Sequence, residues 1–217
     1  MRSRGAKMEN SDQFLHLTYR FSRGVDYARQ VHVNYRKGTQ VPYMAHLLGV
    51  AALVIGEAGH VPFPVTEDIV IAALLHDAVE DEGGLPRLHD IEANFGKEVA
   101  AIVEGCSDTV EEDSSKKEPW EKRKESYIAR LWNEPQGTLL VSVADKLYNA
   151  RAILEDYRIF GPEVWKRFKR GRRAQIWYFN ELIKVYDVKC PGWRIVDELK
   201  RTVAELDSIS AHETPAA

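Results

Sequence analysis

The stretch IVIAALLHDAVEDEGG, residues 69–84, runs from seven consecutive apolar residues directly into a cluster of ionisable ones. Upstream of it, Thr66 is followed by two acidic residues, which is typical of an N-cap and the first turn of a helix. The sequence therefore predicts a helix over residues 67–81 that is buried along most of its length. Four ionisable groups lie at the carboxyl end of this helix: His76, Asp77, Glu80 and Asp81.

These four residues form two pairs on the predicted helix. At about 100° per residue, His76 and Glu80 lie one turn apart on one face, and Asp77 and Asp81 lie one turn apart on the next face. Burying such groups has a high free-energy cost unless a cation or hydrogen bonds compensate them. The cluster therefore predicts a metal site, and His76 and Asp77 need further ligands to complete it.

Two other ionisable residues are embedded in apolar helical segments in the same way. His46 lies in PYMAHLLGVAAL (42–53), and Asp145 lies in LLVSVADKLYNARAIL (139–154). Combined with His76 and Asp77, they give two nitrogen and two oxygen ligands. Such a set suits Mn²⁺, Fe²⁺ or Zn²⁺ better than Ca²⁺.

Each of these two residues also has an ordinary structural interpretation. His46 alone fits a hydrogen-bonded histidine of the core or the surface. Asp145 alone fits a buried ion-pair partner of Lys146 or Arg151. The metal-site hypothesis therefore depends on all four ligands lying close together.

Apolar residues recur at helical spacing in most of the 217-residue chain, and no segment alternates apolar and polar residues for long enough to build a sheet. The pattern predicts an all-α single domain over residues 13–207, with a flexible N-terminus at 1–12 and a flexible tail at 208–217. Residues 108–118 are expected to form an exposed loop. The predicted helices cover residues 13–35, the segment after Pro42, 67–81, 87–95, 96–107, 120–132, 135–155, 162–186 and 193–206.

Composition excludes several classes of protein. With 30 Lys and Arg against 33 Asp and Glu, the formal charge is -3, so no overall positive field attracts nucleic acid. No apolar run approaches the ~20 residues of a membrane span, and the N-terminus leads into no signal-peptide core. Cys106 and Cys190 are expected to be reduced thiols, and we expect a cytoplasmic protein.

One local basic run, KRFKRGRR (166–173), has six basic residues in eight. It supports the hypothesis of a non-enzymatic nucleic-acid-binding helical protein, which predicts steeply salt-dependent binding. The alternative is a solvated charged face on a helix whose aromatic residues fill the core. The sequence favours this alternative.

Four segments share the order and spacing of a known enzyme family. They are YRKGTQVPYMAHLLGVAALV (35–54), HDAVED (76–81), FGKEVAAIVEGCSDT (95–109) and VADKLYNARAIL (143–154). They resemble the RK-G-PY-H, HDxVED, FG-V-V-TD and ADKL-N-R segments of the RelA/SpoT-type small alarmone hydrolases, which are HD-domain metal-dependent phosphohydrolases. The similarity covers about residues 25–187 and implies an HD-domain helical bundle.

The resemblance implies which residues hold the metal and which handle the attacking water. The implied ligands of a single ion, usually Mn²⁺, are His46, His76, Asp77 and Asp145. The implied catalytic pair is Glu80 and Asp81.

The resemblance also implies residues that bind the substrate. Arg36 and Lys37 match a basic pair near the nucleotide, and Asn149 matches a residue that touches the ribose and phosphate region. The segment PWEKRKESY (119–127) is similar to one whose basic residues approach the diphosphates, here Arg123 and Lys124.

The implied reaction is Mn²⁺-dependent hydrolysis of the 3′-diphosphate of guanosine 3′,5′-bis(diphosphate), ppGpp, or of pppGpp, to pyrophosphate and GDP or GTP. Synthetase activity is not expected, because the chain stops where the long enzymes continue. Ala152 lies where some long members have a threonine near the base, a difference that concerns guanine recognition. The alternative is an HD phosphohydrolase acting on another nucleotide, such as ppApp, NADPH or a nucleoside monophosphate, because the metal site would look the same for these substrates. The sequence leaves a homo-oligomer open and predicts no membrane partner.

Overall fold

The computed structural model describes residues 14–111 and 116–211, and these residues form a helical bundle without a β-strand. A single isolated β-bridge within them pairs Tyr35 with Pro42 and closes the loop that precedes the second helix. The predicted all-α, single-domain fold is confirmed. The division into a flexible N-terminus and tail stays a prediction, because most of those residues lie outside the described ranges.

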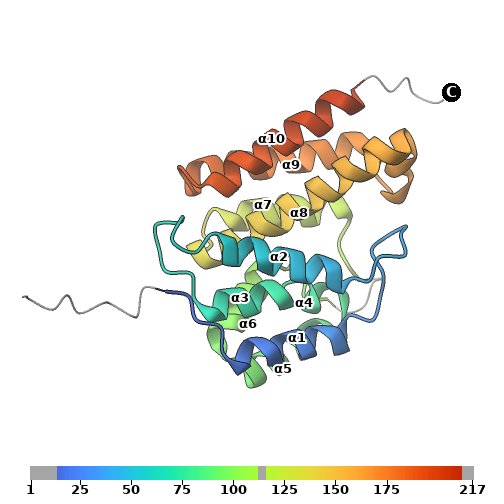
Figure 1. The fold of residues 1–217 in the computed structure, drawn as a ribbon. Helices are drawn as coiled ribbons and strands as arrows, with labels where there is room; N and C mark the ends of the chain where they lie inside the picture. The colour runs from blue at the N-terminus through green and yellow to red at the C-terminus, as the bar shows by residue number, and fades with distance from the viewer. Residues whose placement is uncertain (1–13, 112–115, 212–217) are drawn as a thin grey trace, which may run out of the picture.

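The helices follow one another with short connections, as Figure 1 shows. In chain order they are α1 (Tyr19–Val31), α2 (Met44–Gly56), α3 (Glu67–Leu75), α4 (Ala78–Asp81), α5 (Gly84–Phe95), α6 (Lys97–Cys106), α7 (Trp120–Leu131), α8 (Gln136–Phe160), the 3-10 helix η2 (Gly161–Arg167), α9 (Gly171–Lys189) and α10 (Arg194–Ser210).

The helices stack in layers, with α9 and α10 on one side of the bundle and α1 and α5 on the other (Figure 1). Helix α2 packs between α3 and α8, and α8 in turn packs against α10. Every residue of α3 from Ile69 to Leu75 is buried, which agrees with its uninterrupted apolar sequence. The most buried layer of the bundle is therefore the one that carries the ionisable cluster.

The helix predicted over 67–81 is interrupted after Leu75. The imidazole Nδ1 of His76 lies 2.9 Å from the carbonyl oxygen of Ala73, a bond that ties the His76 ring to the last turn of α3. A short helix then resumes at Ala78. His76 and Asp77 keep backbone angles in the right-handed helical region, so their side chains leave the chain on neighbouring faces and reach the same cluster from there.

Three other predicted boundaries are wrong. The helix predicted over 162–186 is divided into η2 and α9, because Phe168 is extended and Gly171 has a φ of 65°. The first helix spans 19–31, where Thr18 caps its start, and not 13–35. Helix α10 continues to a buried Ser210, beyond the predicted end of this helix at 206.

No helix of the described part is both long and apolar enough to cross a membrane.

Candidate active site

The four predicted metal ligands converge in the core. His46 Nε2 lies 3.2 Å from Asp77 Oδ2 and 3.3 Å from Asp145 Oδ1. His76 Nε2 lies 3.1 Å from Asp77 Oδ2 and 3.6 Å from Asp145 Oδ1, and the two Nε2 atoms are 3.2 Å apart. Ligands at right angles on an ion with bonds of about 2.1 Å stand about 3.0 Å apart, so these separations suit one shared cation.

Three separate elements position these side chains. His46 lies in the first turn of α2, His76 and Asp77 follow the end of α3, and Asp145 lies in the buried half of α8. Both imidazoles are buried, with 0% and 2% of His46 and His76 exposed. Asp145 is buried as well, and Asp77 is partly exposed. A bound cation would compensate the burial of these ionisable groups.

The orientation of the rings also fits a metal. Because His76 Nδ1 bonds the carbonyl of Ala73, its proton belongs there and Nε2 carries a lone pair toward the cluster. His46 Nδ1 is buried without a partner in the described structure, and its Nε2 likewise faces the carboxylates. Imidazole nitrogens and carboxylate oxygens aimed at one point are the donor set of a divalent transition metal.

Neighbouring side chains hold the two carboxylates in place. Tyr43 donates its hydroxyl proton to Asp77 Oδ2 at 2.7 Å, and Asn149 Nδ2 donates to Asp145 Oδ1 at 2.5 Å. Burial opposes the charge on Asp145, but the ammonium group of Lys146 next to it holds the pKa of this carboxyl well below its usual range. The cluster therefore retains its negative charge at neutral pH.

The predicted catalytic pair lies on α4, beside the ligands. Glu80 Oε2 accepts from the backbone N–H of Asp108 at 3.3 Å, and Glu80 Oε1 lies 3.5 Å from Arg123 Nη1. Desolvation, with the nearby charge of Asp77, raises the pKa of Asp81 to about 7. Desolvation also raises the pKa of Glu80. The carboxyl group of Asp81 can therefore carry a proton close to neutral pH.

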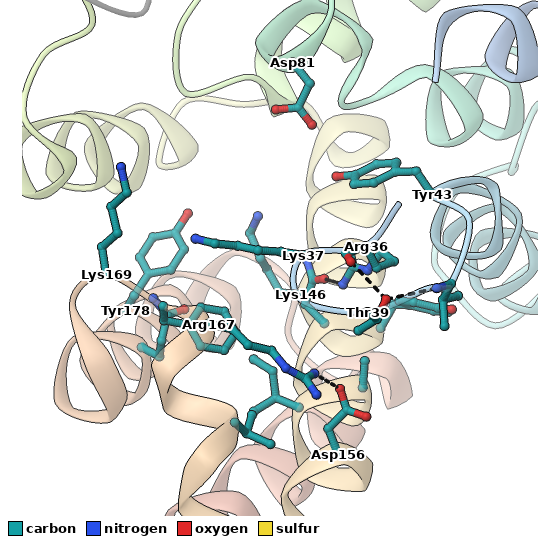
Figure 2. A pocket seen from close by; sticks show the side chains of 18 of the residues that line it. Arg36, Lys37, Thr39, Tyr43, Asp81, Lys146, Asp156, Arg167, Lys169 and Tyr178 are labelled. Atoms are coloured by element: carbon teal, nitrogen blue, oxygen red, sulfur yellow. Dashed lines mark hydrogen bonds and ion pairs between the residues drawn. The ribbon is translucent and has the colours of Figure 1, made fainter. Parts of the chain in front are cut away.

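A cavity of about 1430 Å³ opens beside this cluster (Figure 2). Its walls come from the loop before α2, from α7, α8 and η2, and from α9. Eight lysines and arginines line it against four carboxylates. All five predicted substrate-binding residues are among its lining: Arg36, Lys37, Arg123, Lys124 and Asn149.

These five residues are not equally free to bind a ligand. Arg123 and Lys124 both form ion pairs with the buried Asp108, the second at 2.6 Å. Arg36 donates to the side-chain oxygen of Asn149 at 2.6 Å, and its guanidinium lies 5.5 Å from the centre of the Tyr43 ring. Arg36 and Asn149 are therefore linked to the predicted metal ligand Asp145 as well as facing the cavity.

Sequence reasoning missed several residues of the site. Tyr43, which lies within a quoted segment, contacts Asp77. The ion pair of Asp145 with Lys146 was considered only as an alternative to metal binding, and the structure contains it beside the predicted ligands. Tyr178 and Lys169 line the cavity from parts of the chain that were assigned to the core and to a solvated face.

Comparisons with known proteins agree with this geometry. The model of the HD domain family matches residues 24–170, which is more than half of the chain. The human guanosine-3′,5′-bis(diphosphate) 3′-pyrophosphohydrolase MESH1 is 35% identical over 149 residues, covering 66% of this chain and 73% of the human protein. The mouse protein of the same name is 37% identical over 131 residues, covering 58% of this chain and 65% of its own length.

Two solved structures are also similar. One, described as a metazoan ortholog of SpoT that hydrolyzes ppGpp, has a TM-score of 0.69 at 23% identity and covers 88% of this chain and 97% of its own. The second, lmo0812 from Listeria monocytogenes EGD-e, has a TM-score of 0.60 at 30% identity and covers 76% and 99%. The GTP pyrophosphokinase rsh of Brucella suis is 29% identical over 136 residues, only 17% of its length.

The predicted family resemblance is confirmed, and the relatives support the predicted hydrolase class. The chain belongs to the HD-domain family and is related to its guanosine-3′,5′-bis(diphosphate) 3′-pyrophosphohydrolases.

Proposed function

We propose that the protein hydrolyses the 3′-diphosphate of ppGpp or pppGpp and releases pyrophosphate and GDP or GTP. The observation that carries this proposal is the position of the four-ligand cluster beside a cavity rich in lysine and arginine. A nucleotide with two diphosphate groups needs several cations besides a metal, and this cavity supplies them.

We assign the cation to His46, His76, Asp77 and Asp145, and we propose Mn²⁺ as the resident ion. A divalent ion held there supplies Lewis acidity and lowers the pKa of water that it coordinates. The mixed nitrogen and oxygen donors suit Mn²⁺, and Fe²⁺ or Zn²⁺ would also fit them.

Glu80 and Asp81 act on the protons of the reaction. The carboxylate of Glu80 accepts a proton from the attacking water, and the Asp108 amide and Arg123 keep that carboxylate in place. Asp81 has a pKa raised to about 7, so its carboxyl group can donate a proton to the leaving oxygen near neutral pH. The side chains of Arg36, Lys37, Arg123 and Lys124 bind the phosphate groups, with Asn149 near the ribose.

The nucleic-acid alternative has less support. In the run 166–173, Lys166 pairs with Glu163 and Arg172 pairs with Asp207. Arg167 and Arg170 are paired with Asp156 and Glu121. Most of the run is therefore neutralised locally, which leaves little net positive surface to displace counterions from a polyanion.

A panel of nucleotides tests the proposed function. Purified protein with Mn²⁺ is incubated with ppGpp, pppGpp, ppApp, NADPH and a nucleoside monophosphate, and the products are separated by ion exchange. We expect ppGpp and pppGpp to be consumed, with pyrophosphate and not orthophosphate as the second product. Consumption of NADPH or ppApp alone would assign the alternative substrate, and RNA binding that weakens steeply with salt would support the nucleic-acid alternative.

Two further expectations accompany this proposal. We propose that the protein has no synthetase activity, so ATP and GTP incubated with it should yield no ppGpp. We also propose a cytoplasmic location, where its nucleotide substrate would be formed and consumed.

A further inference from the structure

The basic run 166–173 does not lie on one solvated face. The break between η2 and α9 places Arg167, Lys169 and Arg170 along the cavity wall. Arg167 and Arg170 have carboxylate partners, whereas no ion pair is found for Lys169 among the described residues. Among the three members of the run that line the cavity, Lys169 is therefore the one whose charge is available to a ligand.

The loop before α2 is in direct contact with the η2–α9 connection at the edge of the cavity. A Cβ atom added at Gly38 would lie 2.8 Å from Arg167 Cγ, so the loop backbone rests directly on the Arg167 side chain. The ammonium group of Lys37 lies 6.0 Å from the centre of the Phe168 ring. Lys37 likewise has no carboxylate partner among the described residues. The ammonium groups of Lys37 and Lys169 therefore both lack a counter-charge, and they come from the two segments that meet here, the loop before α2 and the η2–α9 connection.

The hydroxyl group of Tyr178 lies on the same wall and lacks a hydrogen-bond partner in the described structure. Tyr178 is only 6% exposed, and Lys124 Nζ lies 5.0 Å from its ring centre. Figure 2 shows this hydroxyl group and the ammonium ends of Lys37 and Lys169 facing the same space. A buried hydroxyl without a partner is destabilising, and a ligand oxygen would satisfy it.

The ammonium group of Lys146 connects this region to the metal ligands. Lys146 forms an ion pair with Asp145, and its Nζ lies 5.8 Å from the centre of the Tyr178 ring. A nucleotide whose 3′-diphosphate lies at the ligand cluster can therefore extend its other phosphate groups past Tyr178 toward the η2–α9 connection.

We propose that Lys37, Lys169 and the hydroxyl group of Tyr178 form a second phosphate subsite, which binds the 5′-phosphate chain of the nucleotide. This inference rests on the proposed function and adds a specificity determinant to it. Since the subsite is remote from the bond that is hydrolysed, it favours substrates by the length of their 5′-phosphate chain.

The test compares three substrates in the Mn²⁺-loaded enzyme: pppGpp, ppGpp and guanosine 3′-diphosphate without a 5′-phosphate. For Lys169→Met and Lys37→Met we expect the KM of pppGpp and ppGpp to rise about tenfold, because each variant loses a charge-assisted hydrogen bond to phosphate. The KM of guanosine 3′-diphosphate should change less than twofold. Tyr178→Phe, which removes one hydroxyl group and keeps the ring, should have the same selective effect to a smaller degree.

Lys166→Met is the matched control, since Lys166 belongs to the same run but is paired with Glu163 and does not line the cavity. It should leave all three KM values unchanged. Equal increases of all three KM values in Lys169→Met, or no increase in any, would overturn the subsite.

A binding measurement separates this inference from the proposed function. Calorimetry of the Mn²⁺-loaded protein with GTP, GDP and guanosine should give affinities that fall in this order and that differ less in Lys169→Met. The wild-type protein could hydrolyse none of the three substrates and still bind GTP more tightly than GDP, and GDP more tightly than guanosine. In that case the proposed function fails and the subsite stands. Equal affinity for GTP and guanosine in the wild-type protein would overturn the subsite itself.

Discussion

Two imidazoles and two carboxylates in an apolar core need a specific electrostatic partner. The ligand atoms of His46, His76 and Asp145 lie within 4.8 Å of one another, and all three residues are buried. Asp77 adds an oxygen that lies 3.1 Å from His76 Nε2. Repulsion between the carboxylates is relieved by the hydroxyl of Tyr43, the amide of Asn149 and the charge of Lys146, and a cation would complete the compensation.

Replacing Glu80 tests the assignment of the proton acceptor. Glu80→Gln keeps the shape of the side chain but removes the basic carboxylate, so we expect kcat to fall by about 10²–10⁴. Metal content and the Kd of a product nucleotide should stay close to the wild-type values. Steady-state kinetics and equilibrium dialysis measure the two effects, and full activity in the variant would rule out this role of Glu80.

Asp108 gives a prediction about pH and stability. Although burial opposes its charge, Lys124 and Arg123 hold the pKa of Asp108 below its ordinary value. The folded state therefore binds this proton more weakly than the unfolded state, so the stabilisation is present above about pH 4 and is lost as the pH falls through the folded-state pKa. We expect Asp108→Asn to lower the free energy of unfolding by about 1–3 kcal/mol at pH 7.

Urea unfolding between pH 2 and 7 measures this effect. The difference between wild type and Asp108→Asn should shrink toward zero as the pH falls below about 4. Asp26→Asn is the control, because Asp26 is 68% exposed and should contribute less than about 0.5 kcal/mol. A constant difference across the whole pH range would show that the ion pairs of Asp108 are not its cause.

At the residue scale, the sequence predicts the positions that break an apolar pattern. His46, His76, Asp77 and Asp145 are each a polar residue within or at the end of a buried apolar helix, and that mismatch is visible without a structure. Tyr178 carries no such signal, because an aromatic residue in a helix is compatible with an ordinary core. Its unpartnered hydroxyl group becomes apparent only when the surrounding walls are known.

The elements position the site through close contacts between helices. Helix α2 approaches α8 at Gly49, where an added Cβ would lie 2.0 Å from Cε2 of Tyr148. The Tyr148 ring lies edge-on to His46, with ring centres 5.0 Å apart. The glycine therefore permits the contact that brings the histidine of α2 near the aspartate of α8.

Gly49→Ala should destabilise the protein despite its favourable helix propensity. Alanine in a helix interior is favoured over glycine by about 1 kcal/mol, but here the overlap with Tyr148 should outweigh it, for a net loss of about 1–3 kcal/mol. Gly56→Ala in the same helix is the control, since no atom lies within 4 Å of its added Cβ, and it should be neutral or slightly stabilising. Thermal unfolding measures the stability of both variants. Equal stability of Gly49→Ala and Gly56→Ala would show that the close approach of Gly49 to Tyr148 does not limit the side chain at this position.

At the element scale, periodicity predicts where helices lie, but it does not predict where they are interrupted. One interruption follows Leu75, and another comes before Gly171, where Phe168 is extended. Neither changes the apolar pattern that sequence reasoning uses. Both lie next to ionisable residues of the site or of the cavity wall, so the details of the site were harder to predict than the fold.

At the scale of the whole molecule, lysine and arginine side chains gather around one cavity. The chain carries a formal charge of -3, yet eight lysines and arginines and only four carboxylates line the cavity. The family match ends at residue 170, whereas Gln175, Tyr178 and Phe179 of α9 close one wall. The cavity therefore depends on α9 as well as on the HD-domain region.

Metal binding should stabilise the entire fold, because its ligands come from three elements. At a free Mn²⁺ concentration of 100 times Kd, the stabilisation is about 2.7 kcal/mol. For a domain of this size it corresponds to an increase in Tm of about 5–10 °C. Differential scanning calorimetry with and without EDTA measures the shift, and His76→Ala should show almost none. An equal shift in that variant would place the stabilising ion elsewhere.

The most direct test of the account is a Mn²⁺ titration followed by electron paramagnetic resonance, in the wild-type protein and in Asp145→Asn. The account predicts one tightly bound ion per chain in the wild-type protein and binding about a hundredfold weaker, or more, in the variant, since a charged ligand is lost while the shape of the side chain is kept. Unchanged affinity in Asp145→Asn, or no tight site in the wild-type protein, would contradict it.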